Sequence, residues 1–469
     1  MPSSDDDRFR RGLQNRHIQL IALGGAIGTG LFLGLGSTIQ LAGPAVIVSY
    51  AVGGLIAFLI MRQLGEMMTQ EPVAGSFSNL AHKYWGDFAG FFSGWNYWFL
   101  YVLVGMSELT AVSKYMHFWY PDVPEWQTVL FCFLLINAIN LANVKIFGEL
   151  EFWFALIKVA AIIGMIILGG SILISGSGGE LSSVSNLWQY NGFFAEGAYG
   201  VFISLGIVMF SFGGLELVGI AAAEADDPQR SIPKAVNQVI YRILLFYVGA
   251  ILVLICLYPW TMLANTADQS DWAAYMQASP FVLVFKHIGR DMAAHILNFV
   301  VLTAALSVYN SGVYCNSRML FGLAAQQNAP RIFTGVSANG VPTAAILMSS
   351  AFTLACVILS YAIPKEALGI LMSLVVSSLL LNWTMISLTH MKFRKAMIAK
   401  GEKILFRAFW HPFSNYLCLA FMLLIYANIY LLGMKAAVYM APAWIFLVWL
   451  GYRTKLTLRR DAGQSRLHS

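Results

Sequence analysis

Three ionisable side chains lie within stretches of the sequence that are otherwise apolar. Glu108, Lys158 and Glu216 each stand in a segment long enough, at about 20 residues, to cross a membrane. A charge inside hydrocarbon is costly, so such residues pair with other groups or line a polar path. Desolvation disfavours the ionised form, and each group is therefore a candidate to bind and release a proton as its surroundings change.

Each of these residues also has a purely structural interpretation. Lys158 is near the start of its segment and can extend its ammonium group to the membrane surface. Glu108 can cap or pair with a neighbouring helix, and Glu216 can form a structural hydrogen bond. Both interpretations stay open, with Glu108 taken as the proton-coupling residue only after Lys158 and Glu216.

Two of the apolar segments contain runs of glycine where a membrane helix should be continuous. Residues 24–30 read GGAIGTG, and residues 210–214 read FSFGG. Unpaired peptide groups inside a bilayer cost several kcal/mol each, so a helix breaks there only where protein, water or a ligand satisfies them. The glycines of the first run also suit close helix packing. A dinucleotide loop is excluded because no strand precedes this run. Two matched breaks favour a central binding site.

A pair of broken helices has the right groups to bind a zwitterion such as an amino acid. Free N–H groups at the start of a half-helix attract a carboxylate, and free carbonyls at the end of one accept from an ammonium. The predicted carboxylate donors are the N–H groups near Gly28, Thr29 and Gly30, with the Thr29 hydroxyl as an addition. The predicted ammonium acceptors are the carbonyls near Ala26, Phe210, Ser211 and Gly213.

The composition indicates an integral membrane protein that is entirely helical. The 469 residues are 58% hydrophobic and 11% charged, against about 25% charged for soluble domains. Twelve apolar runs are long enough to span a bilayer: 18–37, 41–61, 91–112, 127–144, 152–175, 199–222, 243–261, 296–317, 342–362, 367–389, 412–433 and 436–452.

The distribution of basic residues predicts the orientation. With a cytoplasmic N-terminus, 24 of the 29 Lys and Arg residues fall on the cytoplasmic side, as the positive-inside rule requires. Residues 1–17 form a polar tail without a signal-peptide cleavage site. The net charge of +6 comes from the tails and the loop near residue 400, so no nucleic-acid partner is needed to explain it.

The order of the spans predicts two halves of opposite topology within a single domain, residues 18–453. Repeat one covers about 18–175 and repeat two about 199–389, with the breaks opening segments one and six. Two further helices follow at about 412–452, and residues 454–469 form a second cytoplasmic tail. No stretch separates a soluble domain.

Other chemistries find little support. The five cysteines lie in apolar spans without C-x-x-C spacing and are expected to be small buried hydrophobes. No H-E-x-x-H or Walker A pattern occurs, so an enzyme is disfavoured. No charged ring or filter sequence suggests a channel. We expect no cofactor, no metal and no obligate protein partner; membrane lipid and a small substrate are the expected contacts.

Several strings together resemble one known family. They are NRHIQL at 15–20 followed by GGAIGTGLF, AGP at 42–44, FGELEFWFALIK at 147–158, FSFGGLELVG at 210–219, AEA at 223–225 and NSRMLFGLA at 316–324. The chain resembles the bacterial amino acid permeases of the amino acid-polyamine-organocation superfamily, from about residue 8 to about 455. Within them it looks most similar to the permeases for aromatic amino acids.

This resemblance implies a fold, a location and a mechanism. The fold is the five-plus-five inverted repeat with broken helices 1 and 6, in the bacterial inner membrane, and transport is secondary and driven by proton symport. Thr29 and Gly30 match the family's carboxylate-binding amides, and Ala26, Phe210 and Gly213 match its ammonium-binding carbonyls. Glu216 matches an acidic residue implicated in proton handling. Lys158 matches a lysine that, in some relatives, stands where sodium-coupled relatives hold the ion.

We therefore predict a proton-coupled importer of phenylalanine, tyrosine and tryptophan. Tyr101, Phe210 and Gly312 are the candidates for the side-chain pocket, and Gly312 stands where some relatives carry a bulky gate. The external stretch 264–279 is longer than the family pattern. The alternatives are import or exchange of another large neutral amino acid, and a nutrient sensor that does not transport.

Overall fold

The computed structural model describes residues 27–72, 77–142, 144–217, 227–264, 279–363 and 366–465. Every regular element in these ranges is a helix, as predicted, and they contain no strand. The helices are α2 (Thr29–Phe32), α3 (Gly34–Ala42), η3 (Gly43–Ala45), α4 (Val46–Gln70), α5 (Phe77–Trp85), α6 (Asp87–His117), α7 (Glu125–Ala142), α8 (Val144–Ser175), η4 (Val184–Leu187), α9 (Gly197–Val208), η5 (Met209–Phe212), α11 (Pro228–Arg242), η6 (Ile243–Gly249), α12 (Ala250–Leu257), α13 (Trp260–Ala264), α15 (Pro280–His287), α16 (Asp291–Ala325), η7 (Arg331–Thr334), α17 (Thr343–Thr353), α18 (Ala355–Ala362), α19 (Ala367–Lys400), α20 (Phe413–Leu431) and α21 (Lys435–Ser465).

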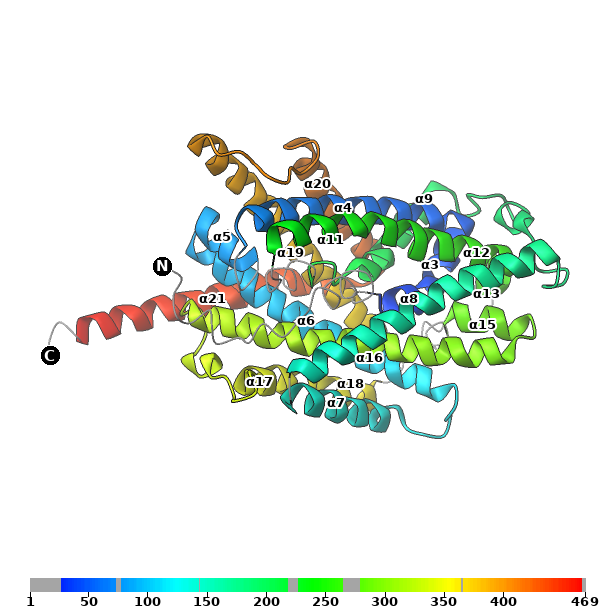
Figure 1. The fold of residues 1–469 in the computed structure, drawn as a ribbon, viewed down its shortest axis with the longest axis horizontal. Coiled ribbons are helices and arrows are strands. Elements are labelled where there is room, and N and C mark those ends of the chain that lie inside the picture. The colour runs from blue at the N-terminus through cyan, green and yellow to red at the C-terminus, as the bar shows by residue number, and fades with distance from the viewer. Residues whose placement is uncertain are drawn as a thin grey trace.

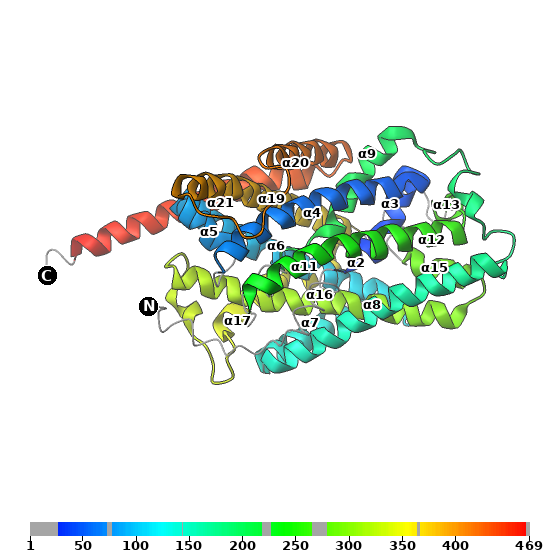
Figure 2. The same ribbon diagram turned by 45° about the horizontal axis from the view of Figure 1, so that its top comes forward.

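The long helices run roughly along the longest axis of the molecule and form one elongated bundle (Figures 1 and 2). The centre of the bundle is α6, which packs along both α16 and α19. The short helices α2 and η5 contact each other, and α2 also contacts α16. The two interrupted segments are therefore surrounded by the long helices that follow them in the chain.

Among the described residues, nine helical stretches are long and apolar enough to cross a membrane. The interrupted segment α9–η5 is shorter, at Gly197–Phe212. The helix α6 adds 31 residues, which is about 46 Å of helix at 1.5 Å per residue. The described part of the chain therefore has the form of a multi-spanning membrane bundle.

In two places the helix begins well before the predicted span. The span predicted at 152–175 begins at Val144, and the one predicted at 243–261 continues a helix that begins at Pro228. Glu151 and Arg242 are charged and were therefore placed outside the predicted spans, yet their side chains are 0% and 1% exposed. Both charges lie inside the bundle, where other polar groups contact them.

The backbone is non-helical at described residues of both glycine runs. The helix α2 begins at Thr29, after an extended Gly28. In the second segment α9 ends at Val208, the 3₁₀ helix η5 follows, and the backbone then turns over residues 213–216. Gly214 has φ of +92°, a conformation that residues with a Cβ rarely adopt. The polypeptide is therefore non-helical at the second break for a local steric reason.

Polar side chains link the long helices to one another. Asn96 on α6 donates to the Asn382 side chain on α19 at 2.9 Å, and Asn140 on α7 donates to Asn310 on α16 at 2.8 Å. Inside a membrane the hydrophobic effect does not drive helices together, so hydrogen bonds and close packing take over. These contacts hold α6, α16 and α19 in fixed positions around the breaks.

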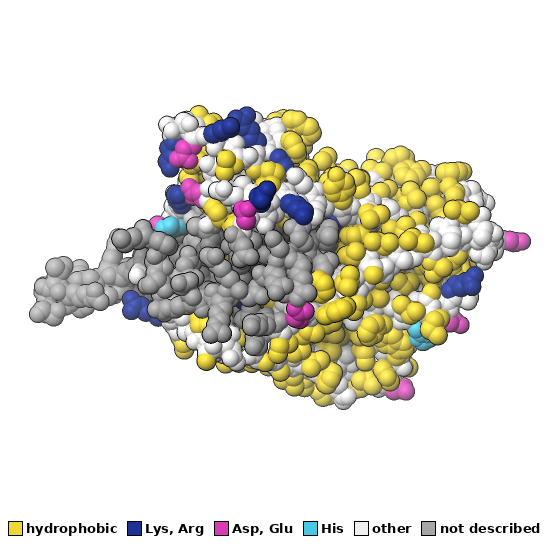
Figure 3. Space-filling model, viewed as in Figure 1, with side chains coloured by type: hydrophobic (Ala, Val, Ile, Leu, Met, Phe, Trp, Pro, Cys, Tyr) yellow, Lys and Arg dark blue, Asp and Glu magenta, His cyan; other side chains and the backbone are white. Residues whose placement is uncertain are grey.

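One face of the molecule shows how its surface is divided. Hydrophobic side chains cover the part over α8, α16 and α7, whereas Lys and Arg gather over the end of α19 and the segment after it (Figure 3). There Glu66, 0% exposed, accepts from Arg394 and from the Ala408 N–H, the latter at 2.5 Å. This end of the bundle is fixed by charge pairing, and the broad apolar band suits lipid.

Several predictions cannot be followed in the structure. Ala26, the N-terminal tail and most of the external stretch 264–279 lie outside the described residues. The five cysteines are all within them, and all are free and buried. They pack as small hydrophobes, as the sequence predicted.

Candidate functional site

At the first break a carboxylate accepts hydrogen bonds from a backbone N–H that no helix satisfies. The Thr29 N–H lies 3.3 Å and 3.4 Å from the two carboxylate oxygens of Glu108, and the Thr29 hydroxyl donates to Oε1 at 3.0 Å. Thr29 is 0% and Glu108 2% exposed. Glu108 therefore caps α2 from a different helix, α6, which is the structural role considered for it. The contact also shows that the N–H and the hydroxyl of Thr29 can donate hydrogen bonds to a carboxylate.

An ammonium group lies on the other side of the same break. The Nζ of Lys158 donates to the Ile27 carbonyl at 3.3 Å and to the Ser307 hydroxyl at 2.9 Å. Lys158 is 0% exposed, so extension to the membrane surface is wrong for this residue. With α8 starting at Val144, Lys158 lies near the middle of that helix rather than at its start. It joins segment one to α16.

Lys158 belongs to a larger polar cluster that sequence reasoning missed. The Ser307 hydroxyl, which accepts from Lys158, donates to Glu151 Oε1 at 2.6 Å, and Asn310 donates to Glu151 Oε2 at 3.4 Å. Ser307 thus stands between the buried ammonium and a buried carboxylate. The available signal was spacing, because Glu151 precedes Lys158 by seven residues, and residues seven apart share a helix face.

The second break carries a carboxylate of its own. Glu216 Oε2 accepts from the Gly214 N–H at 3.1 Å, and Glu216 Oε1 accepts from the indole N–H of Trp383 on α19. Trp383 and Glu216 are 0% and 1% exposed. Glu216 therefore forms the structural hydrogen bonds considered for it, and it is not part of the cluster around Lys158.

Two tyrosines hold the segment before the second break. The Tyr247 hydroxyl donates to the Ser211 carbonyl at 2.9 Å, and the Tyr50 hydroxyl is 3.2 Å from the Ser211 hydroxyl. Buried Arg242 donates to the Tyr247 hydroxyl at 3.1 Å. Tyr247 lies in η6, a π-helical turn, a form that is frequent at functional sites. The Ser211 carbonyl, predicted to accept from an ammonium, thus already has one donor.

The two breaks touch through their backbones. A Cβ atom placed on Gly30 would lie 2.6 Å from the Ser211 Cα and 2.9 Å from Cδ1 of Phe210. A Cβ on Gly312 would lie 3.5 Å from Cδ1 of Tyr101. The structure therefore brings Gly30, Phe210 and Ser211 together, and separately places Gly312 beside Tyr101, which packs on the Tyr97 ring with centroids 4.9 Å apart.

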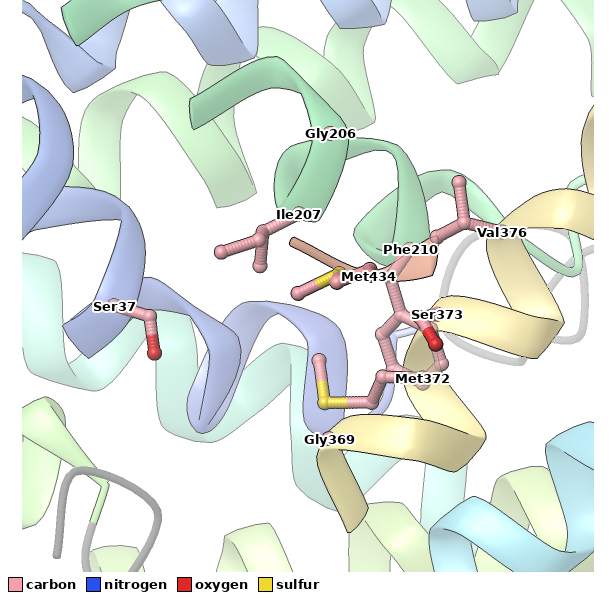
Figure 4. Close-up of a pocket in the computed structure, with 9 residues that line it drawn as sticks. All are labelled: Ser37, Gly206, Ile207, Phe210, Gly369, Met372, Ser373, Val376 and Met434. Carbon is pink, nitrogen blue, oxygen red and sulfur yellow. The ribbon is translucent and has the colours of Figure 1, made fainter. Parts of the chain in front are cut away.

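A small hollow with a volume of about 20 Å³ lies beside Phe210. Side chains from α3, α9 and α19 surround it, with Met372 reaching from α19 toward Ile207 on α9 (Figure 4). Apart from Phe210, its lining contains none of the predicted binding residues; it is formed by Ser37, Gly206, Ile207, Gly369, Met372, Ser373, Val376 and Met434. It lies against the halves of segments one and six that are predicted to face outward.

A wider groove lies between α6 and α21, away from both breaks. It is lined by Phe91, Trp95 and Trp444 among others, with Lys455 at one end, and it contains no predicted binding residue. Its aromatic walls and single lysine are typical of a surface at the membrane interface. Of the two, only the small hollow beside Phe210 touches a predicted binding residue.

Comparison with known proteins places this geometry in a family. The amino acid permease family model matches residues 17–462. The chain belongs to the amino acid permeases. It is 58% identical over 450 residues to the aromatic amino acid transport protein AroP of Escherichia coli K12 and, equally, to that of Shigella flexneri, covering 96% of each chain. The uncharacterized amino acid permease YtnA of Bacillus subtilis is 44% identical over 458 residues, 97% of this chain and 96% of that one.

Membership of this family settles the class of activity. The protein is a multi-pass membrane permease rather than an enzyme. Within the described residues no group of three or more His, Cys, Asp or Glu side chains is placed to hold a metal ion.

Proposed function

We propose that this permease imports aromatic amino acids across the bacterial inner membrane by proton symport. The observation that supports the proposal is the Glu108 carboxylate bound at Thr29, because the N–H and hydroxyl donors there are of the kind that binds a carboxylate. The preference for phenylalanine, tyrosine and tryptophan is supported by 58% identity to the relative named as an aromatic amino acid transport protein.

The proposed architecture has twelve spans with both termini in the cytoplasm. Repeat one, about 18–175, and repeat two, about 199–389, are inverted relative to each other, and α20 and α21 are additions to that core. The interruptions near residues 28 and 213 support this pairing. Alternating access then consists of movements of the broken segments relative to α6, α8 and α16.

Backbone groups bind the two charged groups of the amino acid, and a cavity binds its ring. The N–H groups of Gly28, Thr29 and Gly30 bind the carboxylate, and carbonyls of the two breaks bind the ammonium. Tyr101, Phe210 and Gly312 form the side-chain pocket. Residue 312 carries no side chain, and a Cβ atom there would already contact the Tyr101 ring at 3.5 Å, so a larger side chain would compete with a ring bound beside Tyr101.

Proton coupling is assigned first to Lys158. It contacts the Ile27 carbonyl directly, so loss of its proton weakens a bond to the broken segment. A change of protonation is thereby converted into a change in the position of segment one. Glu216 and Glu108 are further buried groups whose charge can vary with the access state.

The test is uptake of labelled phenylalanine by proteoliposomes with an imposed pH gradient. We expect accumulation above equilibrium only with the gradient, and competition by tyrosine and tryptophan but weakly by the other amino acids. Phenethylamine and phenylpropionate each lack one charged group and should compete poorly, since each hydrogen bond to a charged group is worth about 1.5 to 3 kcal/mol.

Three results would redirect the proposal. Equal competition by leucine and phenylalanine would indicate a general importer of large neutral amino acids. Uptake that needs an internal amino acid rather than a pH gradient would indicate exchange. Absence of any uptake by protein that is folded and binds phenylalanine would indicate a sensor.

A further inference from the structure

Glu108 occupies the position that the proposed function gives to the substrate's carboxylate. Its two oxygens accept from the Thr29 N–H and the Thr29 hydroxyl, the donors assigned above to the amino acid. On the same break, the Lys158 ammonium bonds the Ile27 carbonyl. The protein thus presents to its own broken helix a carboxylate and an ammonium, the two charged groups of an amino acid.

We propose that Glu108 is an internal competitor for the substrate: its carboxylate holds the carboxylate site of segment one, and an incoming amino acid must displace it. This inference rests on the proposed function and adds a role for a residue on α6. Thr29 supplies the hydrogen bonds to Glu108 among the described residues, so displacement breaks contacts at a single position.

The two carboxylates cannot occupy the site together. A Cβ atom on Gly28 would lie 2.6 Å from Oε1 of Glu108 and 2.9 Å from a methyl group of Val308. The Glu108 carboxylate is therefore packed directly on the backbone, with no room for a second one. Two carboxylates a few ångströms apart also do not both stay ionised in a buried site.

The charged groups around Glu108 favour a proton as the partner of displacement. Lys158 on α8 interacts with it electrostatically, and Tyr115 faces it from its own helix. Beyond Lys158 lie Glu151 and Arg242, which interact electrostatically with that lysine. Once the substrate's carboxylate takes the Thr29 donors, Glu108 has lost them while Lys158 still has Glu151 nearby. Glu108 then binds one proton from the side on which the substrate enters and releases it when it returns to Thr29.

A first experiment uses the full-length wild-type protein in nanodiscs and needs no mutation. Binding of phenylalanine and of phenethylamine is measured at about pH 8 and about pH 5.5. Phenylalanine should bind about tenfold tighter at the lower pH, because its apparent affinity is reduced by the fraction of protein in which Glu108 holds the site. Phenethylamine has no carboxylate and should change by less than about twofold, since it does not compete with Glu108.

A second experiment removes the charge of the competitor. Glu108→Gln keeps the shape of the side chain and an acceptor for Thr29, but a neutral amide binds these donors more weakly. Phenylalanine should bind this variant about tenfold tighter than wild type at about pH 8, with no remaining pH dependence. Glu71→Gln is the control, because it removes a carboxylate that pairs with Lys83 and takes no part in the contacts of Thr29 or Lys158. It should keep the pH dependence.

The outcomes separate this inference from the proposed function. Equal pH dependence for phenylalanine and phenethylamine overturns the inference. So does Glu108→Gln with wild-type affinity and pH dependence, or Glu71→Gln with the same loss as Glu108→Gln. Each of these leaves import of aromatic amino acids standing. Wild-type protein that binds none of the twenty amino acids overturns both. If Glu108→Gln is not monodisperse, the wild-type comparison alone decides.

Discussion

The two breaks have the same cap but obtain it in different ways. At each, a buried carboxylate accepts from a backbone N–H that has no partner in a helix. At the first break the carboxylate is that of Glu108, 79 residues away on α6. At the second it is that of Glu216, two residues along the same segment and fixed by the Trp383 indole. One cap is brought by another helix, and the other is part of the turn it stabilises.

This difference separates a variable contact from a permanent one. A cap from α6 is lost whenever α6 and segment one move apart, so its energy depends on the conformation of the transporter. A cap between residues 214 and 216 moves with its own segment and is retained. The first break is therefore suited to exchange one carboxylate for another, and the second to keep its shape while it moves.

The largest expected effect is that of replacing Lys158, which contacts the first break from a different helix, α8. Lys158→Ala removes the ammonium from the Ile27 carbonyl and leaves Glu151 without a nearby cation, and breaking such a buried arrangement costs about 3 to 5 kcal/mol. We expect no accumulation of phenylalanine in proteoliposomes with a pH gradient. Lys83→Ala is the control, since Lys83 is exposed on α5 and pairs there with Glu71 at 2.7 Å. Accumulation by Lys158→Ala at the wild-type level would remove this lysine from the mechanism.

A smaller effect is expected where the breaks touch. Gly30→Ala places a methyl group against the backbone of Ser211, and overpacking of this kind costs about 1 to 3 kcal/mol, so the initial rate of uptake should fall about tenfold or more. Gly34→Ala meets the terminal methyl of Met372 at 3.3 Å and a methyl group of Ile207 at 3.7 Å. Its uptake rate should stay within about threefold of wild type, because a methionine side chain adjusts easily. Equal rates for the two variants would show that the breaks move independently.

Filling the proposed ring pocket should weaken the binding of tryptophan more than that of phenylalanine. Gly312→Leu fills the space beside Tyr101, so tryptophan should lose about tenfold in competition with labelled phenylalanine while phenylalanine itself loses about threefold. Gly164→Leu is the control, since a Cβ there meets nothing within 4 Å. Equal losses for both substrates, at normal expression, would place the pocket elsewhere.

The smallest effect on transport is expected at the second break. Glu216→Gln keeps an acceptor for one of the two donors, the Gly214 N–H or the Trp383 indole, and should weaken the pH dependence of uptake less than Glu108→Gln does. Trp383→Phe removes the indole donor and should lower the free energy of unfolding by about 1 to 3 kcal/mol, measured as a lower melting temperature, with the rate of uptake nearly unchanged. A complete loss of pH dependence in Glu216→Gln would reverse the roles given to the two carboxylates.

The sequence predicted what is local and missed what depends on packing between distant segments. The glycine runs indicated both interruptions, because a residue without a Cβ is required where Gly214 turns. The contact between Thr29 and Glu108 joins helices far apart in the chain, and no spacing rule predicts it. Glu151 and Arg242 were placed outside the spans because a hydropathy boundary treats every charge as solvated. A buried serine or tyrosine that bonds such a charge has no distinct signature in sequence.

The contact between Gly30 and Ser211 also has a consequence for engineering this permease. Backbone lies against backbone there, with a Cβ distance of 2.6 Å to the Ser211 Cα, so no side chain at residue 30 is available to be redesigned. Under the proposed function, changes of substrate preference are to be sought instead at Tyr101 and Gly312, the residues assigned to the ring pocket. Libraries that leave the two breaks untouched and randomise these two positions should retain the transport cycle while sampling new cargo.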